Sequence, residues 1–225
     1  SAIEDHFDHS VELEATLAAK GKTQALDMVQ QMMRNPGSVM YVRQQEPAGL
    51  GHAVWCARHL AQSEPVAVLL ADDLILGTGC LGEMISAYNG GNMVAVMDVP
   101  QNETASYGIV TPGADDGRIV EVNGLVEKPS PKDAPSNIAV VGRYIIEPGV
   151  FTHLDRQEQG AGGEIQLTDS LARQIGEVPF SGLRFSGERF DCGSKIGFLQ
   201  ANIAFALQRD ELGQHLKSWL TERVK

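Results

Sequence analysis

Two stretches near the start of the chain place apolar residues at helical spacing. Residues 8–20 and 24–34 repeat apolar side chains every three or four positions, as at Leu26, Val29 and Met33. Charged and amide side chains fill the positions between them. This period is typical of amphipathic helices, so both stretches are predicted to be helical.

Further along, apolar runs that suit buried strands alternate with segments that suit helices. The alternation comprises a strand at 38–44, a Gly-opened helix at 49–62, a strand at 66–70, a helix at 80–88 and a strand at 92–100. Strands that alternate with helices favour a parallel sheet covered by helices. The pattern in the first half of the chain therefore predicts a largely parallel sheet in an α/β fold.

After Pro100 the strands become shorter and are punctuated by glycine. They are expected at 106–113, 117–129 and 137–146, and helices follow at 148–155, 167–176 and 194–208. No repeat or linker interrupts the chain, which predicts one domain over residues 1–225 with a small β elaboration. Residues 209–225 are expected to form a helix at the surface or at a subunit contact.

The composition of the chain excludes some binding partners and indicates the cellular compartment. The chain has 225 residues, 43% of them hydrophobic, and a net charge of -11, which argues against binding nucleic acid or anionic membranes. An anionic substrate would need a local group of basic residues or a metal ion. Three cysteines without C-x-x-C spacing favour a reducing compartment and no zinc site. No apolar run approaches the roughly 20 residues that span a bilayer, so a cytoplasmic location is predicted.

Two glycine motifs suggest nucleotide binding but lack the required context. "GKT" at 21–23 follows a helix and lacks the glycine five positions earlier that a P-loop needs. "GTGCLG" at 77–82 matches a dinucleotide fingerprint, with Asp98 at a suitable distance, but its first glycine does not follow the strand directly. A glycine-rich loop before a helix is the preferred interpretation.

Charged residues at strand ends are the stronger candidates. The run "PVAVLLADDLI" ends a buried strand with Asp72 and Asp73, which should point to opposite faces. Asp191 follows another strand, directly before a helix-opening turn, and Lys195 lies in the first turn of that helix. A lysine is disfavoured there by the helix dipole, and a bound anion would remove the penalty.

Two further places allow both a functional and a structural interpretation. Gln44 lies at a strand end before Gly49, where an amide could read a nucleobase edge or belong to a solvated turn. Glu127 and Lys128 could grip a sugar and a phosphate, or form a charged strand edge stopped by Pro129. Because neighbours on a strand point to opposite faces, these two side chains are not expected to pair with each other.

Seven ordered motifs give the chain a family resemblance. They are "VRQQEPAGLGHAV", "LLADDLI", "SYGIV", "GLVEKP", "AVVGRYII", "GGEIQLTD" and "RFDCGSKIGFLQA". In this order the chain resembles bacterial UTP–glucose-1-phosphate uridylyltransferases, a group of sugar-phosphate nucleotidyltransferases. The resemblance implies a mixed, mainly parallel Rossmann-like sheet of the nucleotide-diphospho-sugar transferase type. It also implies the conversion of UTP and glucose 1-phosphate to UDP-glucose and pyrophosphate, with Mg²⁺ as cofactor.

The resemblance also implies roles for individual residues. Asp72 and Asp191 would bind the metal, and Lys128 and Lys195 would contact phosphates. If one Mg²⁺ joins the two acids, their carboxylates should lie within roughly 8 Å of each other. The uracil would be read by Gln44 and Gly49, and the glucose pocket would be lined by Gly108, Glu127, Val141, Gly142 and Glu164.

One hallmark of the family is missing from this sequence. The glycine-rich loop G-x-G-T-R-x-x-P-x-T-K has no match, so the chain is expected to be N-terminally truncated and to lack the first strand–helix units. Two alternatives stay open: a sister enzyme that uses dTTP and, because the loop is absent, a non-catalytic binding fragment. A homo-oligomer, either a dimer or a tetramer, is expected, without nucleic-acid or membrane partners.

Overall fold

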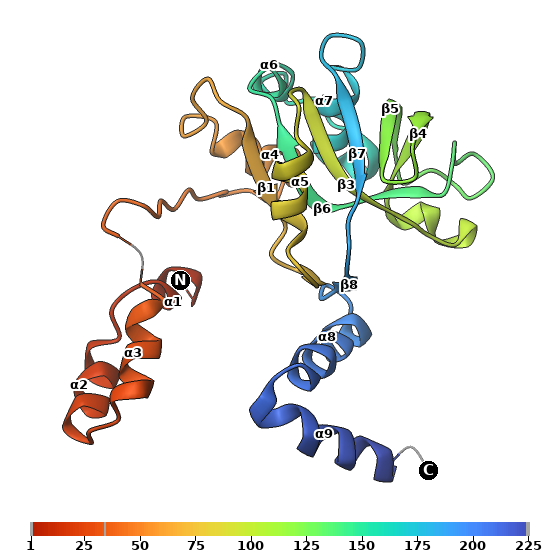
Figure 1. Ribbon diagram of the computed structural model, residues 1–225. Helices are drawn as coiled ribbons and strands as arrows, with labels where there is room; N and C mark the ends of the chain where they lie inside the picture. The colour runs from red at the N-terminus through yellow and green to blue at the C-terminus, as the bar shows by residue number, and fades with distance from the viewer. Residues whose placement is uncertain (1, 34, 224–225) are drawn as a thin grey trace. The chain divides into compact units, whose positions relative to one another are not determined.

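The computed structural model describes residues 2–33 and 35–223 (Figure 1). The α-helices are α1 (Ala2–His6), α2 (Val11–Ala19), α3 (Thr23–Gln31), α4 (Leu50–Cys56), α5 (Cys80–Ala87), α6 (Val150–Leu154), α7 (Leu167–Ala172), α8 (Lys195–Leu207) and α9 (Asp210–Arg223). Two 3₁₀ helices are η1 (Gln101–Ser106) and η2 (Ala161–Gly163). The strands are β1 (Val66–Leu69), β2 (Asp73–Leu76), β3 (Asn92–Asp98), β4 (Gly108–Asp115), β5 (Ile119–Glu127), β6 (Ile138–Ile146), β7 (Phe180–Arg184) and β8 (Glu188–Asp191).

The chain divides into two compact units, residues 1–45 and 46–225. The first unit contains α1 to α3, so the two helices predicted near the start of the chain are confirmed, although Arg34 lies outside the described residues. The strand predicted at 38–44 is wrong, because these residues form no regular secondary structure. A strand is stabilised by hydrogen bonds to a neighbouring strand, and none is paired with this segment in the described chain. The sequence around residues 45 and 46, at the boundary between the two units, does not have the composition of a linker. The single domain predicted over residues 1–225 stays a prediction.

The second unit is built on a six-stranded mixed sheet with the order β1-β6-β3-β7-β5-β4 (Figure 1). A mixed α/β fold is confirmed, but the expected majority of parallel pairs is not found in the described chain. There only β3 and β7 pair in parallel, and the other neighbours are antiparallel. Both β1 and β3 run antiparallel to β6. They therefore share one direction, as the strand–helix alternation predicted, but β6 lies between them.

Helices cover both faces of the central strands, which explains their nearly continuous apolar sequences. On β3, Val94 and Val96 belong to a core that includes Val150, Leu154 and Leu171 of α6 and α7. The alternate residues Met93 and Ala95 belong to a second core with Cys80 and Met84 of α5. Side chains on a strand alternate between faces, so each face of the sheet has its own helical cover.

A separate two-stranded ribbon joins distant parts of the chain. Strands β2 and β8 pair antiparallel, with Asp73 opposite Asp191. The pairing is extended by the amide of Cys192, which donates to the carbonyl oxygen of Asp72 at 2.7 Å. The ribbon therefore brings the two predicted metal-binding acids to one place.

The C-terminal helix α9 follows α8, and both carry exposed apolar side chains. Phe198 and Leu199 of α8 are more than half exposed, and Trp219 of α9 is nearly half exposed. Residues 224–225 lie outside the described chain, and a subunit contact through 209–225 stays a prediction. Over the described ranges, the chain has no helix whose length and apolar content would let it cross a bilayer.

Candidate active site

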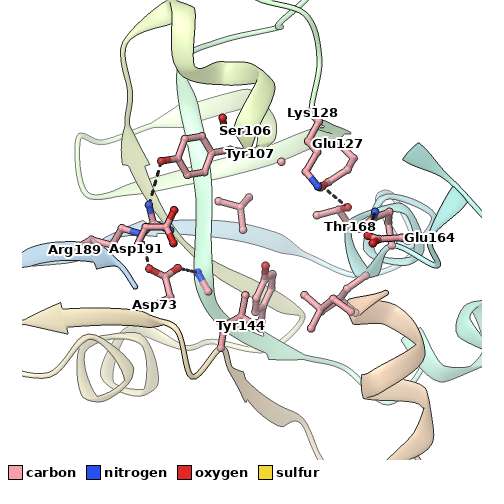
Figure 2. Close-up of a pocket in the computed structure, with 17 residues that line it drawn as sticks. Asp73, Ser106, Tyr107, Glu127, Lys128, Tyr144, Glu164, Thr168, Arg189 and Asp191 are labelled. Atoms are coloured by element: carbon pink, nitrogen blue, oxygen red, sulfur yellow. Dashed lines mark hydrogen bonds and ion pairs between the residues drawn. The ribbon is translucent and has the colours of Figure 1, made fainter. Parts of the chain in front are cut away.

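A cavity of about 270 Å³ opens within the second unit, between the ends of several strands and α7 (Figure 2). It is polar, and most of its charged side chains come from strand ends or the loops beside them. Six of the residues predicted from the sequence line it: Gly108, Glu127, Lys128, Gly142, Glu164 and Asp191. Residues more than 80 positions apart along the chain thus meet in one place.

One side of the cavity is held by the ion pair of Asp73 and Arg189. The Nε of Arg189 donates to Oδ1 of Asp73, and its Nη1 donates to the Tyr107 hydroxyl at 3.1 Å. The other oxygen of Asp73 accepts the amide of Gly142 at 2.6 Å. Only 5% of the Asp73 side chain and 14% of the Arg189 side chain are exposed. The pair therefore ties the β2–β8 ribbon to β6 in a place where unpaired charge would be costly.

The predicted metal-binding acids approach each other at the end of the ribbon. A Cβ atom added at Gly193 would lie 3.0 Å from Oδ1 of Asp191 and 3.4 Å from Oδ2 of Asp72. The two carboxylate oxygens are therefore no farther apart than the sum of these distances. This separation is inside the limit of roughly 8 Å set for two ligands of one magnesium ion.

These two acids suit a magnesium ion that is shared with a substrate. No group of three or more His, Cys, Asp or Glu residues is arranged to hold a metal in the described ranges. Mg²⁺ keeps several waters and is often held by one or two carboxylates together with substrate phosphates. The pair of Asp72 and Asp191, with no side chain at Gly193 between them, fits that kind of site.

On the opposite side of the cavity in Figure 2, Glu127 and Lys128 lie close together. The expectation that they cannot pair is wrong, because Nζ of Lys128 lies 3.7 Å from Oε1 of Glu127. Strand β5 ends at Glu127, and Lys128 has a φ of 48°, in the left-handed region. The regular alternation of side chains stops there, so both can turn toward the cavity.

Glycines allow the close approach of backbone and side chains around the cavity. A Cβ at Gly108 would lie 3.0 Å from the methyl group of Thr168 and 3.2 Å from Oε2 of Glu127. At Gly142 it would lie 2.8 Å from Oδ2 of Asp73. A side chain at either position would force these neighbouring atoms to move.

For two of the predicted residues, Val141 and Gly49, the structure shows a packing role. The side chain of Val141 is buried in the core with α5, on the face of β6 opposite to Val140 and Tyr144. Only its backbone could therefore contribute to the cavity. Gly49 has a φ of 103°, and a Cβ there would approach Glu164 and Ile165 to 2.8 Å. Packing thus requires glycine at this position whether or not a base binds beside it.

The remaining predicted residues lie outside the lining of the cavity. Gln44 belongs to the first unit, so its role in reading a base stays a prediction. Lys195 is the exposed first residue of α8, after Ser194, whose hydroxyl accepts the amide of Gly197 at 3.0 Å. Lys195 follows Asp191 closely enough in the chain to stay near the acid pair.

Several cavity residues were missed by the sequence analysis. Arg189 lies two positions before Asp191 on β8, and Tyr144 lies two positions after Gly142 on β6, so strand alternation could have placed both beside a predicted residue. Burial, followed by the nearby charges of Glu127 and Asp73, raises the pKa of the Tyr144 hydroxyl above the usual range. Tyr144 therefore stays neutral and can donate a hydrogen bond into the cavity.

Comparisons with known proteins agree with this arrangement. Residues 9–206 match the family model of nucleotidyl transferases. A UTP–glucose-1-phosphate uridylyltransferase of Komagataeibacter xylinus is 51% identical over 195 residues, which cover 85% of this chain and 69% of the relative. A UTP-bound UGPase from Acinetobacter baumannii has a TM-score of 0.89 at 37% identity, over 99% of this chain and 79% of that chain. A UDP-glucose pyrophosphorylase complexed with UDP-glucose has a TM-score of 0.81 at 35% identity, over 92% of this chain and 77% of that chain. The resemblance inferred from the seven motifs is confirmed, and the chain belongs to the nucleotidyl transferase family.

Proposed function

We propose that the protein transfers a uridylyl group from UTP to glucose 1-phosphate and so forms UDP-glucose and pyrophosphate. The observation that carries this proposal is the cavity, in which Glu127 and Lys128 face the ribbon that holds Asp72 and Asp191. One side offers a carboxylate and an amine for a sugar phosphate. The other side offers two acids for a metal that accompanies a nucleoside triphosphate. The relatives named above act on, or were solved with, the same compounds.

The reaction needs no nucleophile from the protein. A phosphate oxygen of glucose 1-phosphate attacks the α-phosphorus of UTP in line, and the bond from that phosphorus to the bridging oxygen of pyrophosphate breaks. The attacking oxygen already carries negative charge, so catalysis consists of positioning and charge neutralisation. Lys128, which lines the cavity, and Lys195, four positions after Asp191, would contribute positive charge for the phosphates.

Magnesium is the cofactor of this proposal. Asp72 and Asp191 would hold it, and the bound ion would neutralise charge on the phosphates of UTP. The first role of the chain is then to keep the two carboxylates together on the ribbon. Its second role is to keep the sugar phosphate at the other side of the cavity in the right orientation.

The base and the location complete the proposal. Because the relatives are named for UTP, we expect this protein to use uridine rather than thymidine nucleotides. Gln44 and Gly49 would read the uracil. A cytoplasmic location suits a reaction that consumes a nucleoside triphosphate. The exposed apolar side chains of α8 and α9 would suit a homo-oligomer.

The test is a substrate panel with the purified protein and Mg²⁺. UTP with glucose 1-phosphate should give UDP-glucose and pyrophosphate, and dTTP should react more slowly. Faster reaction with dTTP would identify the sister thymidylyltransferase activity instead. Binding of both substrates without turnover would favour a non-catalytic binding role.

A pair of substitutions tests the two neighbours at the end of β5. Glu127→Gln should impair the discrimination between glucose, galactose and mannose 1-phosphates, because the amide replaces an acceptor with a donor. Lys128→Ala should raise KM for all three sugar phosphates alike, by roughly 10-fold or more, since a hydrogen bond to a charged group is lost. Steady-state kinetics with the three compounds measures both effects.

The matched control for this pair is Lys132→Ala, which removes an exposed lysine from the loop after β5. It should leave the kinetic constants within twofold of those of the wild type. If Glu127→Gln and Lys128→Ala gave the same selectivity profile, the division of roles between them would be wrong. If both matched the control, the pair would be a surface ion pair without function.

A further inference from the structure

Thr168 holds the carboxylate of Glu127 from the side opposite to Lys128. Its hydroxyl donates to Oε2 of Glu127 at 2.8 Å, as the dashed line in Figure 2 marks. Thr168 is 7% exposed and lies near the start of α7, on the wall of the cavity. No motif in the sequence singled out Thr168.

The two oxygens of Glu127 therefore have different partners. Oε2 is engaged by the Thr168 hydroxyl, whereas Oε1 lies 3.7 Å from Nζ of Lys128, beyond hydrogen-bond distance. A threonine hydroxyl carries one proton, and here it is committed to Glu127. Oε1 is thus the oxygen left to accept a hydrogen bond from a ligand when Lys128 turns to a phosphate.

Packing keeps Thr168 in this position. Its methyl group would lie 3.0 Å from a Cβ at Gly108, and Gly108 is the direct neighbour of Glu127 in the β4–β5 pairing. Leu167 and Leu171 of α7, one position before and three positions after Thr168, are buried in the core. The hydroxyl therefore has little freedom to leave Glu127, and the carboxylate is fixed in one orientation.

We propose that Thr168 is a positioning residue that sets the hexose selectivity of the cavity. It does so by orienting Glu127, so that one carboxylate oxygen meets the sugar hydroxyls at a fixed angle. This inference rests on the proposed function, because it takes the ligand beside Glu127 to be a hexose 1-phosphate. A carboxylate that can rotate accepts from either hydroxyl epimer, whereas a fixed one discriminates between them.

The experiment compares three variants of the protein. Thr168→Val removes the hydroxyl and keeps the shape, and Thr168→Ser keeps the hydroxyl. Thr104→Val is the matched control, because Thr104 is also buried and its hydroxyl donates to the carbonyl of Gln101 at 3.0 Å, but it does not line the cavity. The measurements are kcat and KM for glucose and galactose 1-phosphates, KM for UTP, and the melting temperature.

Thr168→Val should raise KM for glucose 1-phosphate about 10-fold, which is the lower range for losing a hydrogen bond to a charged group. Its preference for glucose over galactose should fall by a similar factor, while KM for UTP stays within twofold. Thr168→Ser should restore most of the selectivity. Thr104→Val should lower the melting temperature as much as Thr168→Val without changing selectivity.

Wild-type selectivity in Thr168→Val would overturn the inference. An equal rise of KM for UTP and for the sugar phosphate would also overturn it, because a general loss of structure would then explain the effect. If the wild type showed no turnover, the proposed function would fail by itself, and binding of glucose 1-phosphate measured by calorimetry would decide the role of Thr168. A wild type that binds no glucose 1-phosphate would overturn both.

Discussion

Replacing Asp72 by asparagine should lower kcat by roughly 100-fold or more, because a metal ligand can supply several kcal/mol of charge stabilisation in the transition state. The Mg²⁺ concentration that gives half the maximal rate should rise, since an amide is a weaker ligand for a hard cation than a carboxylate. The affinity for UTP without metal should change little, because the role proposed for Asp72 is to bind the metal ion and not the nucleotide itself. Rates measured over a range of Mg²⁺ concentrations test the first two expectations, and UTP binding measured without metal tests the third.

Asp116→Asn is the matched control for this substitution. Asp116 is exposed in the turn between β4 and β5, where its carboxylate accepts the amides of Arg118 and Ile119 at 2.8 and 2.6 Å. The change in charge is the same as in Asp72→Asn, but the control should keep the wild-type rate. A metal dependence of Asp72→Asn identical to that of the control would contradict the proposed magnesium site.

Replacing Arg189 by alanine should destabilise the second unit by ~3–5 kcal/mol, which is typical when one partner of a buried ion pair is removed. The carboxylate of Asp73 would stay buried with the Gly142 amide as its remaining close donor. In a melting experiment this loss should lower the transition temperature by on the order of 10 °C. The Tyr107 hydroxyl would lose its donor as well.

Arg184→Ala provides the comparison, because Arg184 makes two hydrogen bonds to Asp115 at 2.9 Å in a more exposed setting. An ion pair of this kind contributes about 0–1 kcal/mol, so the melting temperature should change by a few degrees at most. The double variant Asp73→Asn with Arg189→Met should be more stable than Arg189→Met alone, since it removes the unpaired charge. If the losses of stability in the double variant were additive, the broken ion pair would not be the cause of the destabilisation in the single variant.

The predictions from sequence succeeded where a signal was local. The apolar periods located most helices and strands of the second unit, because each element buries its own face. They failed for the pairing of strands, since nothing in the sequences around β1 and β3 shows that β6 inserts between them. The expected strand at 38–44 failed for a similar reason, as strand formation depends on a partner that the local pattern does not contain.

The cavity shows the same limit at the level of residues. Acids at strand ends identified Asp72 and Asp191, and their approach across the ribbon agrees with the expectation. Glu127 and Lys128 were expected on opposite faces, which would hold only if a regular strand continued beyond Glu127. The left-handed backbone of Lys128 ends that regularity, and a single non-glycine residue in this region has no clear sequence signature.

The ribbon of β2 and β8 has a consequence for how the protein is made. It brings together the side chains of Asp73 and Arg189, which lie 116 positions apart in the chain, so its closure carries a large loop entropy and belongs to the slow, non-local part of folding. Synthesis proceeds from the N-terminus, and residues 188–191 emerge after every strand of the central sheet. A nascent chain can therefore assemble its sheet while Asp72 still lacks Asp191. The two acids proposed to bind Mg²⁺ therefore come together only after every strand of the central sheet has been synthesised, and a shorter nascent chain has no such pair.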